Sequence, residues 1–221
     1  SSVAVWIKAC QAEGVLACAK HFPGHGRTRA DSHLELPVVD ASKKDLMDVD
    51  LAPFRAAIDA GVSSIMTAHV AYPSLDPSGE PATTSREMLQ WLLRQQLRFD
   101  GMIVSDSLNM KGALAGRDEG AAAIAAINAG CDVLLFPSDP GAVAERMERA
   151  LAGHELSADN VRQALRRRQK WAQWASPPNE YRKPSATDVA WGAQCAARVV
   201  RMVRGARPAL GSPLDVLVID D

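Results

Sequence analysis

Residues 97–107 read LRFDGMIVSDS, a turn with a glycine followed by a short apolar run that leads to a carboxylate. Stretches with apolar residues at helical spacing lie on both sides of it. The same unit occurs around Gly61 and Gly130, and glycine in this position typically ends a helix. The repeat predicts strands at residues 15–19, 63–67, 102–105 and 132–136, with helices at residues 51–60, 86–97 and 119–129.

The apolar runs also indicate the class of fold. They are nearly unbroken rather than alternating, which is typical of strands buried on both faces of a parallel sheet. Strands that alternate with helices form repeated βα units. Four such units predict an α/β fold that is half of an eight-stranded (β/α)8 TIM-type barrel. A complete open sheet of four or five strands is the alternative.

The remaining sequence predicts a division into domains. Residues 3–12, 141–151 and 157–174 have helical patterns, and residues 176–186 are rich in proline and polar side chains, as in a linker. We expect a partial barrel domain over residues 1–175 and the start of a truncated α/β second domain over residues 187–221, with a helix near 188–203 and a strand at 214–219. The chain therefore reads as an internal fragment of a longer protein.

Composition narrows the possible partners. Hydrophobic residues make up 47% of the chain, enough for a buried core, and the formal net charge of -1 favours neither nucleic acid nor an anionic membrane. No apolar run approaches the roughly 20 residues that span a bilayer. The cysteines lack C-x-x-C spacing, which argues against a disulfide scaffold and favours the cytoplasm without fixing the compartment. They are Cys10, Cys18, Cys131 and Cys195.

The densest polar cluster is KHFPGHG at residues 20–26, followed by Asp31 and His33. Its proline and glycines predict a long loop that leaves the first strand. Three kinds of chemistry fit the cluster. A zinc site would use His21, His25 and His33, although the H-E-x-x-H pattern is absent. A phosphate-binding loop would use the glycines, and an acid–base pair would use Asp31 to orient His33.

Asp106 marks a second candidate site because a carboxylate at the end of an apolar strand needs a partner or a function. Capping of the next helix is the structural explanation. As a nucleophile, Asp106 would attack the anomeric carbon of a sugar whose leaving oxygen receives a proton from a second group. On chemistry alone Glu35 is the obvious second carboxylate.

Three motifs taken together resemble glycoside hydrolase family 3, in particular its bacterial β-N-acetylhexosaminidases, including those that recycle peptidoglycan. The motifs are Lys20–His33 with the Leu-Pro that follows at 36–37, MTAH at 66–69 with Tyr72, and SDS at 105–107. The resemblance implies that the strands are numbers five to eight of the barrel. It also implies that Asp106 is the nucleophile and that His33 with Asp31 forms an acid–base dyad.

Further expectations follow from the same resemblance. Lys20, His21 and His69 would contact the sugar, and no metal or organic cofactor would be needed. The activity would be retaining hydrolysis of a terminal, non-reducing β-linked N-acetylglucosamine from a glycan or muropeptide. The alternatives are a β-glucosidase, β-xylosidase or glycoside phosphorylase of the family, a metal-dependent barrel hydrolase, and a non-catalytic sugar-binding protein. Because the family barrel supplies further sugar-binding residues from earlier strands, we expect this chain alone to be a poor catalyst.

Overall fold

The computed structural model describes residues 2–175 and 185–199, and the chain divides into two compact units, Ser1–Pro177 and Pro178–Asp221. In the second unit the described part is helix α8 (Ala186–Val199). Most of the expected linker, the end of the expected helix at 188–203 and the expected strand at 214–219 lie outside the described residues. None of the described helices is long and apolar enough to cross a membrane.

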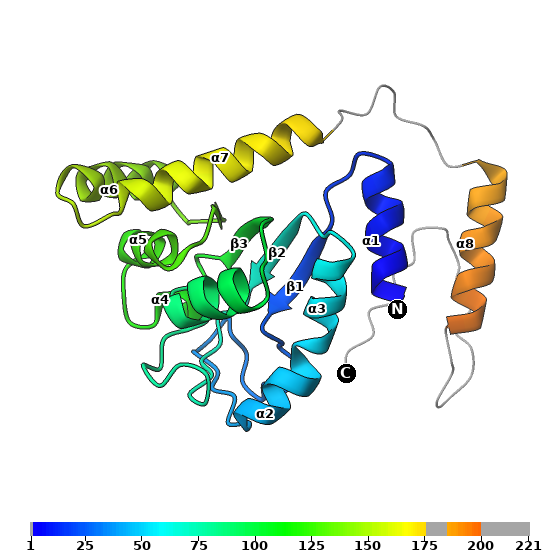
Figure 1. Ribbon diagram of the computed structural model, residues 1–221, viewed down its shortest axis with the longest axis horizontal. Helices are drawn as coiled ribbons and strands as arrows, with labels where there is room; N and C mark the ends of the chain where they lie inside the picture. The colour runs from blue at the N-terminus through cyan, green and yellow to red at the C-terminus, as the bar shows by residue number, and fades with distance from the viewer. Residues whose placement is uncertain (1, 176–184, 200–221) are drawn as a thin grey trace, which may run out of the picture. The chain divides into compact units, whose positions relative to one another are not determined.

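A four-stranded parallel sheet forms the centre of the first unit (Figure 1). Its strands pair in chain order, with Ile65 opposite Ile103 in the central pair. Consecutive parallel strands need a crossover segment between them, which the helices provide. The strands are β1 (Cys18–Phe22), β2 (Ser64–Thr67), β3 (Met102–Ser107) and β4 (Val133–Leu135).

The first strand differs from its prediction. It begins at Cys18 rather than at residue 15, because the chain is still turning away from the preceding helix: Gly14 has a φ of 76°, and the Val15 amide donates to the carbonyl of Cys10. Lys20 and His21 therefore lie within β1 and not in the loop after it. The other three strands overlap their predicted ranges.

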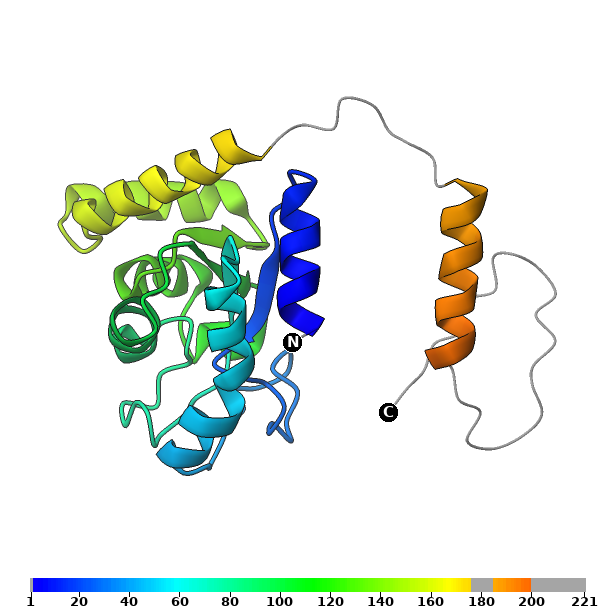
Figure 2. The same cartoon turned by 45° about the vertical axis from the view of Figure 1, so that its right-hand side comes forward.

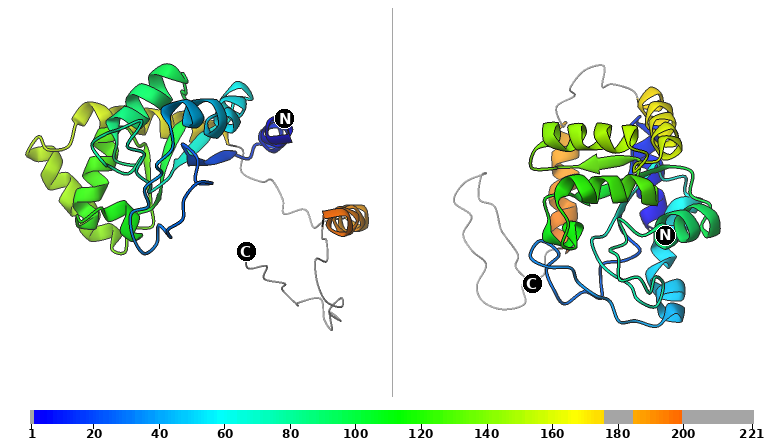
Figure 3. Two further views of the ribbon diagram at one scale, coloured as in Figure 1. Left: turned by 90° about the horizontal axis from the view of Figure 1, so that it is seen from below. Right: turned by 90° about the vertical axis from the view of Figure 1, so that its left-hand side faces the viewer.

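Helices connect the strands and follow the last one, and several begin at side chains that cap them. Asp118, Asp139 and Ser157 each accept a hydrogen bond from an amide in the first turn. Helix α1 contacts α3 (Figure 2), and α5 contacts both α6 and α7 (Figure 3). The helices of this unit are α1 (Ser2–Ala12), α2 (Lys43–Asp45), η1 (Leu46–Asp50), α3 (Ala52–Asp59), η2 (Glu87–Gln96), α4 (Lys111–Leu114), α5 (Glu119–Ala129), α6 (Pro140–Ala152) and α7 (Ala158–Trp174).

The main core lies between the sheet and the helices that connect its strands. Ile65 and Ile103 are fully buried in the same cluster as Leu89 and Leu93 of η2, and Phe22 meets Phe54 of α3 edge to face at 5.3 Å. Burying one such side chain contributes about 1.5–3 kcal/mol. This packing stabilises the strands and thereby the residues at their ends.

Gly101 serves a purpose different from the predicted one. The positive φ that ends η2 falls on Arg98, at 53°, whereas Gly61 and Gly130 do have positive φ. A Cβ atom at residue 101 would lie 2.5 Å from the carbonyl oxygen of Ser63 and 2.4 Å from the Phe99 ring. Glycine is required there because β2 and β3 approach closely at their starts.

A buried ionic cluster lies at the starts of β3 and β4, on the same side of the sheet as Gly101. The Asp132 carboxylate accepts hydrogen bonds from Arg94 at 2.6 Å, Arg167 at 2.9 Å and the amide of Ile103 at 2.8 Å. Only 1% of its side chain is exposed. The cluster joins η2, β3 and α7, and it lies before the strands rather than after them.

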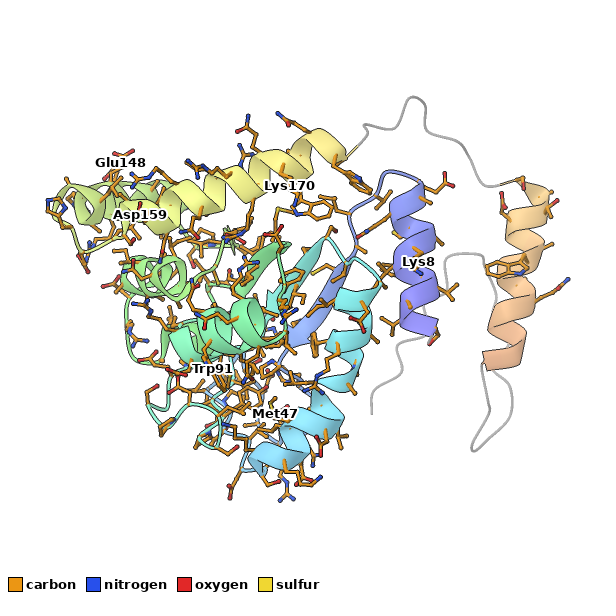
Figure 4. The ribbon with its side chains drawn as sticks, viewed as in Figure 1. Lys8, Met47, Trp91, Glu148, Asp159 and Lys170 are labelled. Atoms are coloured by element: carbon orange, nitrogen blue, oxygen red, sulfur yellow. The ribbon has the colours of Figure 1, made fainter. Side chains whose placement is uncertain are left out.

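Removing this carboxylate should destabilise the unit strongly. Asp132→Ala leaves the buried Arg94 guanidinium without its counter-charge, so the free energy of unfolding should fall by about 3–5 kcal/mol. Asp100→Ala is the matched control, since Asp100 pairs with Lys170 at 3.1 Å in solvent (Lys170 is labelled in Figure 4) and should cost under about 1 kcal/mol. Urea denaturation of both variants measures the difference; equal losses would contradict the assignment.

Candidate active site

The polar residues singled out from the sequence come from three neighbouring strands. His21 lies near the end of β1, Asp106 lies near the end of β3, and His69 follows β2 by two residues. Because parallel strands end at the same edge of a sheet, these side chains gather there. A cavity of about 600 Å³ beside β1 is lined by residues that include Lys20, His21 and His25.

Asp106 and His21 form the centre of this edge. The Asp106 Oδ2 lies 3.4 Å from the His21 Nε2, and its Oδ1 accepts a hydrogen bond from the Ser107 amide at 2.8 Å. Both side chains are about a quarter exposed (24% and 28%). Burial lowers the pKa of His21, against the opposing effect of Asp106, so its ring is neutral near pH 7. His21 therefore approaches Asp106 as a neutral group.

Asp31 and His33 form a pair on the long loop after β1. The Asp31 Oδ1 accepts hydrogen bonds from the His33 backbone amide at 2.9 Å and from His33 Nδ1 at 2.7 Å. The amide and then the ring lower the pKa of Asp31, so it is an anion at neutral pH. A carboxylate can only accept, so Nδ1 carries the proton and Nε2 is the atom directed to other partners. Both side chains are exposed.

Backbone hydrogen bonds attach this loop to the segment that follows Asp106. The Gly112 amide donates to the Ser32 carbonyl at 3.0 Å, and the Lys111 amide donates to the His33 carbonyl at 3.4 Å. Both donors belong to the first turn of α4, which begins shortly after β3 ends. The loop that carries Asp31 and His33, called the dyad loop below, consequently lies at the same edge of the sheet as Asp106.

His69 has a more enclosed environment than the sequence suggested. It is 1% exposed; its Nδ1 lies 2.8 Å from the Thr83 hydroxyl, and its Nε2 lies 3.0 Å from the Ser107 carbonyl. Burial lowers the pKa of His69 and keeps the ring neutral. Lys20, by contrast, is exposed on β1, and Glu35 is exposed on the dyad loop.

Residues that carry no charge also shape the site, and sequence reasoning gave them no role. The Tyr72 hydroxyl donates to the Gly24 carbonyl at 2.8 Å, which fixes the start of the dyad loop. Thr83 supports His69, and Gly112 leaves room for the loop, since a Cβ there would lie 2.9 Å from the Ser32 carbonyl oxygen. Tyr72 lay within a quoted motif; Thr83 and Gly112 carried no signal in the sequence.

His21, His25 and His33 do not form a metal site. His25 instead bonds Thr28, with 2.8 Å between its Nδ1 and the Thr28 hydroxyl, while Asp31 holds His33. Across residues 2–175 and 185–199, no group of three or more His, Cys, Asp or Glu side chains is arranged to hold a metal ion. Each of the three histidines weighed as a zinc donor therefore has polar partners of its own, although the rings of His21 and His25 meet edge to face at 5.9 Å.

Comparison with known proteins gives the family. The sequence model described as "Glycosyl hydrolase family 3 N terminal domain" matches residues 2–170. A beta-hexosaminidase of Thiobacillus denitrificans is 46% identical over 127 residues, which cover 58% of this chain and 35% of that protein. The chain thus spans about a third of this relative's length.

Comparison with solved structures points to the same family. A glycoside hydrolase family 3 beta-N-acetylglucosaminidase from Paenibacillus sp. superposes with a TM-score of 0.76 at 33% identity, covering 84% of this chain and 36% of that one. A beta-glucoside phosphorylase superposes with a TM-score of 0.79 at 25% identity, covering 87% of this chain and 38% of that one. The resemblance seen in the sequence is confirmed: the chain belongs to glycoside hydrolase family 3.

Proposed function

We propose that this chain carries the catalytic groups of a retaining glycosidase that removes a terminal, non-reducing β-linked N-acetylglucosamine. The observation that carries the proposal is the attachment of the Asp31–His33 loop to α4, because it brings a proton donor and the Asp106 carboxylate to one edge of the sheet. The names of the beta-hexosaminidase and beta-N-acetylglucosaminidase relatives support this substrate class.

In this mechanism Asp106 is the nucleophile. Its carboxylate attacks the anomeric carbon while His33 gives the Nε2 proton to the leaving oxygen, so the glycosidic bond breaks as the glycosyl–Asp106 bond forms. In the second step His33 takes a proton from water, which attacks the same carbon and releases Asp106. The ring is neutral while the glycosyl–Asp106 bond exists, and the Asp31 anion stabilises the charged imidazole that enters the first step and is formed again in the second. Lys20 and His21 serve as donors to the sugar hydroxyls.

We further propose that the four strands are numbers five to eight of a (β/α)8 barrel. Their sequential order supports this, and so does the difference between the two faces of the sheet. Ile65 and Ile103 are fully buried against the helices, whereas Met66 and Val104 are only partly buried. In a closed barrel the second face would be covered by the opposite strands. Because those strands also supply sugar-binding residues, activity belongs to the whole barrel.

The acid assignment is tested by comparing two variants in a protein with the complete barrel. His33→Ala should lower kcat/KM for an aryl β-N-acetylglucosaminide with a poor leaving group by about 10²–10⁴-fold, because general acid catalysis is lost. Glu35→Ala is the matched control, because Glu35 is also exposed and follows His33 by two residues on the same loop. It should leave the rate unchanged. Equal, small losses would show that His33 is not the acid. Asp106→Ala should abolish turnover of both good and poor substrates.

A comparison of leaving groups tests the role of Asp31. Asp31→Asn keeps the size of the side chain but removes the anion that accepts the His33 Nδ1 proton in a hydrogen bond, so the ring is no longer oriented for proton transfer. We expect kcat/KM to fall for a substrate with a poor leaving group and much less for one with a good leaving group. Glu35→Ala is the reference. Equal losses for the two substrates in Asp31→Asn would contradict the dyad.

A glycoside phosphorylase is the second candidate, and the phosphorylase neighbour favours it. A neutral imidazole repels an incoming phosphate less than a carboxylate base would. If water is the acceptor, as we propose, products from the whole-barrel protein should be the same free sugar with and without phosphate. Formation of a sugar 1-phosphate in phosphate buffer would instead establish phosphorolysis.

A further inference from the structure

His69 touches the residue next to the proposed nucleophile and offers no free nitrogen to a ligand. We propose that His69 is a positioning residue, which fixes the end of β3 that carries Asp106, instead of a residue that contacts the sugar. The inference rests on the proposed role of Asp106. It replaces the sugar contact expected from the sequence.

The protons on the His69 ring follow from its partners. The Ser107 carbonyl can only accept, so Nε2 must carry the proton in the bond of 3.0 Å. The ring is neutral, and Nδ1 therefore accepts a hydrogen bond from the Thr83 hydroxyl at 2.8 Å. The Ala68 carbonyl lies farther from that hydroxyl, at 3.2 Å. Both ring nitrogens are thus used within the protein.

Ser107 transmits this restraint to Asp106. Its carbonyl accepts the His69 proton, and its amide donates to the Asp106 Oδ1 at 2.8 Å. One residue therefore joins the buried ring to the attacking carboxylate. If the ring were absent, the Ser107 carbonyl would keep the Met110 amide as a donor at 3.2 Å but lose the shorter hydrogen bond from His69. The end of β3 would then be held less tightly on the side of β2. A displacement of about 1 Å at a reacting atom can cost roughly 10²-fold in rate.

The ring is itself held by a buried polar network. Thr83 is 1% exposed, and its hydroxyl lies 2.8 Å from that of Thr67, a fully buried residue of β2. On the other side, a Cβ at Gly112 would lie 3.0 Å from the His69 carbonyl oxygen, so α4 packs directly on this segment. In such surroundings a hydrogen-bond chain keeps one geometry because each unpaired group would be costly.

Kinetics of variants in the whole-barrel protein test the proposal. We expect His69→Ala to lower kcat by about 10²-fold and to leave KM unchanged, with equal losses for good and poor leaving groups. His69→Gln, whose amide can still donate to Ser107, should recover at least part of that loss. Thr83→Val should lower kcat in the same manner, and Thr83→Ser should restore it. These Thr83 variants test the same chain if His69→Ala does not fold.

Ser85→Ala is the matched control for a purely structural effect. Ser85 lies with Thr83 in the loop between β2 and η2 and is 1% exposed. Its hydroxyl donates a hydrogen bond to Asp76 and has no contact with His69 among the hydrogen bonds of the described residues. The substitution should lower stability and leave kcat unchanged. A raised KM with unchanged kcat in His69→Ala would establish a sugar contact and overturn the proposal, as would a kcat loss matched by Ser85→Ala. Turnover that persists in Asp106→Ala would instead refute the proposed function itself.

Discussion

Parallel pairing of β1, β2 and β3 in chain order is the constraint on which the site depends. It brings His21, the segment of His69 and Asp106 to one edge, although 85 positions of sequence separate the first from the last. The pairing is held from the other end of the sheet by Asp132 and its two arginines, and by the close approach that Gly101 permits. The stabilising contacts and the candidate site thus occupy opposite edges of the sheet, as in other parallel α/β folds.

The elements that could be predicted are those with a local cause. Helix α5 has its predicted bounds because Asp118 caps its start and Gly130 permits its end. The start of β1 could not be predicted, since Val15 is apolar and β-prone yet is 54% exposed in the irregular segment just after a turn. Periodicity reports which residues can be buried. It does not report whether a neighbouring strand begins early enough to pair with them.

The residues of the candidate site also fall into those with a local cause, which could be predicted, and those without one. The dyad was predictable because Asp31 and His33 are close in sequence and their bond is local. Gly112 and Thr83 were not, since their roles depend on contacts with Ser32 and His69 that cross between loops. Such contacts are fixed by the fold as a whole, and glycine or threonine in a loop has many possible causes. Charged residues can be singled out as candidate site residues from the sequence, whereas the neutral residues that position them can be identified only from the structure.

Three histidines of the candidate site differ in what surrounds them, and this difference separates the roles that we propose for them. Burial lowers the pKa of both His21 and His69 and keeps their rings neutral, so each can donate one hydrogen bond and hold its geometry. His33 is exposed and has an anionic partner at 2.7 Å. A ring that must gain and lose a proton in each cycle needs such a partner together with access to solvent. Of the three, His33 has the surroundings that the proposed proton transfer requires. His69 is enclosed, as its proposed positioning role requires, whereas His21 is about a quarter exposed and can reach a sugar, as its proposed role requires.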